Sequence, residues 1–216
     1  MTTHFRSFQR GFSMTELMVS IGILAIVFGI GIPNFTTWIS NTQVRSTAES
    51  LLAAIQLARG EAVKQNSLAQ FKLTGDATGS ASWSVIAASS SVSGSFNIAT
   101  DKATSVQTAG ASETGANARL GVSTAAQANP GCCAASVNAG TNMGTNPQPG
   151  IVFDAFGKVV ADTSVTTVTR IDVTKVGDTG ANDEEKNRRM VILISDSGMA
   201  KLCRPSLPAS NSQGCP

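Results

Sequence analysis

The sequence predicts an α+β fold in which a long N-terminal helix packs on an antiparallel β-sheet. Three observations lead to this prediction. An apolar segment at residues 12–38 is long enough to cross a bilayer as a helix. A helical stripe of apolar residues follows at residues 39–66. The rest of the chain, residues 67–216, contains β-branched and apolar runs typical of strands and forms the predicted head.

The composition narrows the class of protein. Of the 216 residues, 42% are hydrophobic and 14% are charged, which is too apolar for a disordered chain. The net charge of +2 does not describe a general nucleic-acid binder. The single histidine, His4, lies in residues 1–11, which are predicted below to be removed. A mature chain without histidine excludes Ser-His-Asp and histidine-ligated metal sites. No GxSxG, GxxxxGK or HExxH motif occurs either, so we expect no enzyme, no cofactor and no metal.

The N-terminus has the charge pattern of a membrane anchor. Residues 1–11 carry Arg6 and Arg10 and no acid, whereas Leu17–Pro33 carries no charge at all. The positive-inside rule keeps the two arginines in the cytoplasm and exports the remainder. A secretory signal peptide is the alternative, but no small-residue cleavage site follows the apolar region. We therefore expect residues 12–38 to be the transmembrane half of the helix.

Glu16 interrupts that apolar segment. A carboxylate there costs about 2.5–3.5 kcal/mol on insertion scales, which indicates a functional residue with a partner. Residues 11–17, Gly-Phe-Ser-Met-Thr-Glu-Leu, resemble the type IV prepilin signature. The resemblance implies that a prepilin peptidase cuts between Gly11 and Phe12 and N-methylates Phe12, and that Glu16 faces the new amine of a neighbouring subunit during assembly. It also implies a helix kink at Pro33 and a bacterial inner-membrane protein with a periplasmic head.

The second half of the helix, residues 39–66, is amphipathic. Its apolar residues follow at helical spacing: Val44, Ala48, Leu51, Ile55, Ala58 and Ala62. The run from Leu57 to Asn66 is similar to the A-R-S-E-A-x-x-R-N run of the FimT/GspH family of minor pilins and pseudopilins, with Gly60 and Gln65 as departures. This resemblance implies a structural subunit of a type IV pilus or a type II secretion filament, whose partners are other pilins and exported protein cargo.

In the head, strands are predicted where apolar and β-branched residues gather. A hairpin is expected within 151–160, with Gly157 at its turn. Few charges occur between Thr74 and Gly150, and a long loop is expected at about 100–149. The other expected strands lie within 81–88, 94–99, 165–176 and 190–194.

Four cysteines in an exported chain favour disulfides. Cys203 and Cys215 are the favoured pair, because they close a loop rich in proline and polar residues at 203–215, and that closure contributes roughly 3 kcal/mol in the chain-entropy model. Adjacent Cys132 and Cys133 have two alternatives: a bond to each other in a strained turn, or pairing elsewhere.

The C-terminus is locally basic. Gly198–Arg204 resembles the G-R-A-R region of FimT-type pilins implicated in DNA binding, with Met199 in place of the first arginine. Phosphate contacts require cations but no particular motif. The alternative functional hypothesis is therefore a pilus-associated DNA receptor for natural transformation, and the structural alternative is a solvated terminal strand. The candidate DNA-binding residues are Arg188, Arg189, Lys201 and Arg204.

Overall fold

The structure, a computed structural model, describes residues 11–88, 103–124, 140–177, 188–208 and 210–215. The chain divides into two compact units, Met1–Trp38 and Ile39–Pro216. In chain order the elements are α1 (Met14–Gln65), β1 (Ala69–Leu73), β2 (Trp83–Ala88), β3 (Ala103–Ala109), α2 (Ala111–Thr114), β4 (Ala118–Ser123), β5 (Pro149–Phe153), β6 (Val159–Val160), β7 (Thr166–Thr167), β8 (Arg170–Lys175), β9 (Met190–Ile194) and β10 (Ala200–Cys203).

Helix α1 ends at Gln65, next to the end predicted from the sequence. It continues through Pro33 without a break in its assignment, and the kink expected there stays a prediction. Within the second unit the predicted apolar stripe is buried, with every member at most 1% exposed: Val44, Ala48, Leu51, Ile55, Ala58 and Ala62. The prediction of an amphipathic helix that fills a protein core is therefore confirmed.

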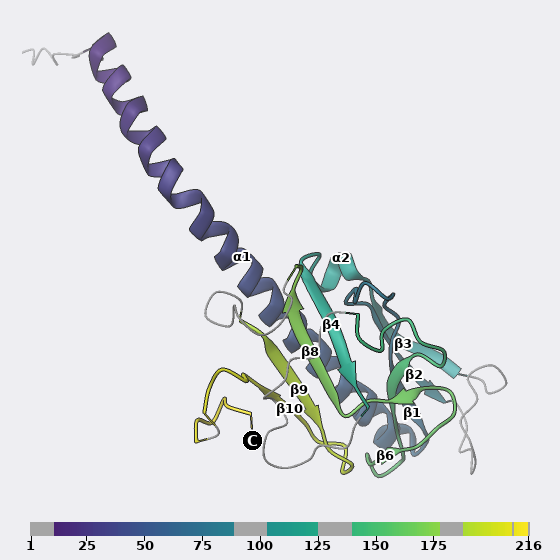
Figure 1. Ribbon diagram of the computed structural model, residues 1–216. Helices are drawn as coiled ribbons and strands as arrows, with labels where there is room; N and C mark the ends of the chain where they lie inside the picture. The colour runs from purple at the N-terminus through teal and green to yellow at the C-terminus, as the bar shows by residue number, and fades with distance from the viewer. Residues whose placement is uncertain (1–10, 89–102, 125–139, 178–187, 209, 216) are drawn as a thin grey trace, which may run out of the picture. The chain divides into compact units, whose positions relative to one another are not determined.

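The described residues of the head form two sheets, whereas the sequence predicts one. The first sheet has the strand order β3-β2-β1-β5-β6, with β7 beside β5. The second sheet has the order β10-β9-β8-β4, and the two sheets lie side by side in Figure 1. All paired strands are antiparallel except the short parallel pair of β5 and β7. Apolar side chains from both sheets join the buried stripe of α1 in one core.

The run at 165–176, predicted as one strand, is divided between the two sheets. The backbone N–H of Val168 donates to the oxygen of Gly150 in the first sheet at 3.1 Å, and the N–H of Thr169 donates to the oxygen of Ser123 in the second at 3.0 Å. The chain therefore changes its hydrogen-bonding partner between adjacent residues. This crossing gives β7 and β8 different neighbours although both come from one β-branched run.

The long loop expected at about 100–149 is the largest correction. Its described part contains β3, α2 and β4, and β5 begins at its end. Strand β3 is an edge strand with a mostly exposed surface, so hydrogen bonds to β2 hold it without an apolar pattern. Strand β4 buries Ala118, Leu120 and Val122, which alternate along the strand. This alternating pattern is short and lies in an Ala- and Ser-rich segment, so the sequence did not predict the strand.

The remaining strand predictions have clear outcomes. Strand β2 lies within the predicted 81–88, β9 coincides with the apolar run at 190–194, and β5 pairs with β6 as the expected hairpin. These three predictions are confirmed. The strand expected within 94–99 lies outside the described residues.

Candidate functional site

The first unit presents the start of α1. Gly11 and Phe12 precede the helix and are exposed. Ser13 lies directly before the first helical residue, and its backbone oxygen accepts the N–H groups of Glu16 and Leu17 at 3.1 Å. The Ser13 hydroxyl also accepts the backbone N–H of Thr15 at 3.3 Å, as an N-terminal cap does. Glu16 thus occupies the first helical turn, where the helix dipole favours a negative charge.

Large apolar side chains cover the helix that follows Glu16. Nine of them between residues 17 and 28 are at least half exposed: Leu17, Met18, Val19, Ile21, Ile23, Leu24, Ile26, Val27 and Phe28. Exposed patches of this size mark contact with another apolar surface. Within the part of the chain that the structure describes, no helix is long and apolar enough to cross a membrane. The transmembrane role of residues 12–38 therefore stays a prediction.

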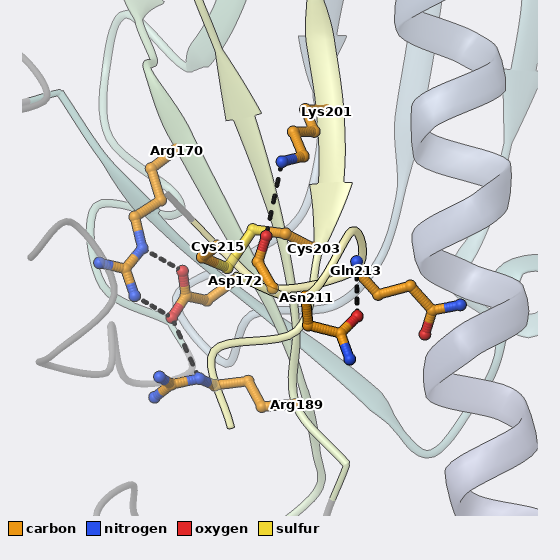
Figure 2. The surroundings of a disulfide bond; sticks show 9 residues. Arg170, Asp172, Arg189, Lys201, Cys203, Asn211, Gln213 and Cys215 are labelled. Atoms are coloured by element: carbon orange, nitrogen blue, oxygen red, sulfur yellow. Dashed lines mark hydrogen bonds and ion pairs between the residues drawn. A yellow bond between two sulfur atoms is a disulfide. The ribbon is translucent and has the colours of Figure 1, made fainter. Parts of the chain in front are cut away.

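A buried charge cluster occupies the outer face of the second sheet (Figure 2). Arg170 on β8 binds Asp172 through two hydrogen bonds, from Nε to Oδ1 at 2.6 Å and from Nη2 to Oδ2 at 2.9 Å. The Nε of Arg189 lies 3.7 Å from the same Oδ2. All three side chains are buried, and Asp172 is 0% exposed. The geometry is that of a structural ion cluster inside the head.

The four candidate DNA-binding residues therefore do not form one surface. Arg189 is only 6% exposed and faces Asp172, so it does not present its charge to a phosphate, which corrects the expectation for this residue. Arg188 and Lys201 are exposed, and Arg204 is half-buried. The Nζ of Lys201 lies 3.5 Å from the oxygen of Gly214.

The C-terminal segment is attached to the second sheet by a disulfide between Cys203 and Cys215, the pair favoured from the sequence (Figure 2). Both cysteines are buried and pack against Val191 and Leu193 of β9. The N–H of Arg204 also donates to the oxygen of Gln213 at 2.7 Å. Cys132 and Cys133 lie outside the described residues.

Among the residues that are described, no group of three or more His, Cys, Asp or Glu side chains could hold a metal ion.

Comparison with solved structures returned the type IV minor pilin FimU of Pseudomonas aeruginosa strain PAO1 in two crystal forms. The first match has 20% identity and a TM-score of 0.44, and covers 79% of this chain and 92% of that one. The second has 19% identity and a TM-score of 0.38, and covers 77% and 94%. A search of curated proteins gave no significant match.

Two family models match the sequence. The prokaryotic N-terminal methylation motif covers residues 6–32, which include Gly11, Phe12 and Glu16. The model described as type II transport protein GspH covers residues 47–198, well over half of the chain. That span takes in most of the buried half of α1 and every strand of the two sheets except β10. The chain therefore belongs to the GspH family of minor pilins and pseudopilins.

Proposed function

We propose that this pilin-family subunit is cut by prepilin peptidase between Gly11 and Phe12, N-methylated on Phe12, and inserted into a type IV pilus or a type II secretion filament. Before assembly, residues 12–38 hold it in the inner membrane, with the head in the periplasm. In the filament the head faces neighbouring pilins or exported protein cargo. The observation that carries this proposal is a row of exposed apolar side chains directly after Glu16 on one helix.

The site at the start of α1 suits both processing and assembly. The bond between Gly11 and Phe12 lies in exposed, non-helical backbone, which a peptidase can bind in an extended form. Cleavage would leave a cationic amine on Phe12, four residues before Glu16. In an apolar filament core a carboxylate and an amine from adjacent subunits offset each other's burial. Removing one of them would leave the other uncompensated at about 3–5 kcal/mol.

Replacing Glu16 by alanine is expected to lower the amount of subunit in sheared filaments by about tenfold or more, because the neighbouring amine loses its partner. The membrane-bound, processed pool stays normal. Glu49→Ala is the matched control, because Glu49 is an exposed acid on the same helix and pairs only at the surface with Arg45. Immunoblots of filament and membrane fractions measure both pools.

Gly11→Ala in the same assay should leave the leader attached, since the bond to be cut follows this residue. Incorporation of Glu16→Ala at the wild-type level, together with normal processing of Gly11→Ala, would refute the proposed mechanism.

A deletion strain separates the two filament systems: loss of piliation assigns the subunit to a pilus, and loss of exoprotein release assigns it to secretion.

DNA contact is the second candidate function, supported by the exposed Lys201 on β10 and the neighbouring Arg204. If both contact phosphates, the double variant Lys201→Gln, Arg204→Gln is expected to reduce the slope of log affinity against log salt by about 2. Titration of the mature chain in detergent with duplex DNA at several salt concentrations measures this slope. Arg45→Gln is the control, because Arg45 is an exposed cation on the helix and lies outside the candidate DNA-binding residues. An unchanged slope in the double variant would remove this candidate.

A further inference from the structure

An open groove of about 510 Å³ lies between the last turns of α1 and the turn that joins β9 to β10. Val63 and Met199 line its two sides and are 51% and 59% exposed, and Ala200 extends the apolar wall. Gly60 also lines the groove, and among the described residues a Cβ atom there would meet nothing within 4 Å apart from its own helix backbone and chain neighbours. The groove therefore has apolar walls and room beside the helix for another chain.

Arg59 places a guanidinium in this groove. Its Nε donates to the backbone oxygen of Gly157 at 3.0 Å, and its Nη1 lies 3.3 Å from the sulfur of Met199. A thioether is a weak acceptor, and a guanidinium has five N–H donors. Among the described residues Arg59 takes part in no ion pair. Two contacts thus fix the position of Arg59 and leave its charge uncompensated by a carboxylate.

Two nearby carboxylates have other partners. Glu61 accepts hydrogen bonds from Gln65 at 2.9 Å and from Lys64 at 3.0 Å, and these two contacts lower the pKa of Glu61. Asp154, in the hairpin that contains Gly157, accepts the backbone N–H groups of Phe156 and Lys158, both at 2.9 Å. Lys64 is likewise paired with Glu61. Gln56 and Lys64 also line the groove, and Arg59 is therefore its cation without a carboxylate partner among the described residues.

We propose that this groove binds an acidic segment of a neighbouring filament subunit, with one carboxylate on Arg59 and apolar side chains against Val63 and Met199. The proposal rests on the proposed function, which supplies neighbouring subunits at high local concentration. Charge complementarity selects the carboxylate, because a fixed guanidinium matches it bidentately. The apolar walls favour a peptide over DNA, whose backbone would need several cations along its path.

The test uses the full-length chain in cells that assemble the filament. A photoreactive benzophenone amino acid replaces Val63, and the sheared filaments are irradiated. We expect an adduct with a filament subunit whose cross-linked peptide, mapped by mass spectrometry, contains Asp or Glu among apolar residues. Arg59→Gln should lower the adduct yield by about tenfold, as expected for loss of charge-assisted hydrogen bonds, and Arg59→Lys by less. The same photoreactive residue at Val106, exposed on β3, is the control and should be insensitive to Arg59→Gln.

A second variant separates binding from folding. Met199→Glu keeps the bond from Arg59 to Gly157 but supplies an internal carboxylate, and it should abolish the adduct while the subunit still enters filaments. Absence of the subunit from filaments would overturn the proposed function and this inference with it. If the subunit enters filaments, three results would overturn the groove proposal alone. The photoreactive residue at position 63 could form no adduct, or the adduct yield could be unchanged by Arg59→Gln and Met199→Glu. The third result is an adduct with nucleic acid, with lipid or with a peptide that contains no Asp or Glu.

Discussion

Asp172→Ala is expected to lower the free energy of unfolding of the head by about 3–5 kcal/mol, the cost of removing one partner from a buried ion cluster. Asp172 is 0% exposed, binds Arg170 with both carboxylate oxygens, and faces Arg189 at 3.7 Å. Without this carboxylate, two buried guanidinium groups repel each other in a region of low dielectric constant. Urea denaturation of the purified chain in detergent, followed by tryptophan fluorescence, measures the loss.

Two further variants define what the buried cluster contributes. Glu49→Ala removes an exposed carboxylate from its pair with Arg45 and should cost less than about 1 kcal/mol. Replacing Arg170, Asp172 and Arg189 together by Met, Leu and Met should recover much of the stability lost in Asp172→Ala, because no buried charge then remains. A loss in Asp172→Ala no larger than that in Glu49→Ala would show that the cluster does not stabilise the head.

Gly198→Ala is expected to destabilise the head by about 2–5 kcal/mol. Gly198 has φ = +79°, and an added Cβ would overlap the backbone oxygen of Gly157. The left-handed conformation accounts for about 1–2 kcal/mol, and the overlap adds about 1–3 kcal/mol because the turn before β6 must move away from Arg59. Thermal unfolding, followed by circular dichroism of the purified chain, measures the combined effect.

Gly177→Ala isolates the backbone part of this effect. Gly177 has nearly the same φ, +80°, but among the described residues beyond its chain neighbours no atom lies within 4 Å of the position that its Cβ would take. Its substitution should therefore cost only the left-handed strain, about 1–2 kcal/mol. Equal losses in Gly177→Ala and Gly198→Ala would mean that close contact between the two turns does not contribute to stability.

Local patterns were enough to predict the helix and several strands. The stripe from Val44 to Ala62 recurs at helical spacing, and the helix buries it as expected. The continuous apolar run of β9 and the hairpin of β5 and β6 carry equally local signals. Strand β3 carries no such local signal, because this edge strand is held by backbone hydrogen bonds to β2 while its side chains stay mostly exposed.

The sequence does not distinguish the structural roles of Arg188 and Arg189. Arg188 and Arg189 are adjacent and look equivalent as candidates for phosphate contact. In the fold Arg188 is exposed, whereas Arg189 is buried against Asp172. Antiparallel pairing of β8 with β9 brings Asp172 opposite Val191, two residues from Arg189. Strand register between distant segments decides the role of Arg189, and no local pattern encodes that register.

Sequence alone determined the features that depend on neighbours along the chain: the motif from Gly11 to Leu17, the buried stripe of α1, and the family run around Arg59. Helical periodicity and a charge within an apolar segment are local properties, so they can be recognised before folding. Tertiary structure alone decided that the described strands form two sheets, that Arg189 is buried, and that Arg59 lines a groove beside Val63 and Met199. Each of these arises from contact between residues far apart in the chain, where strand pairing and packing select the neighbours.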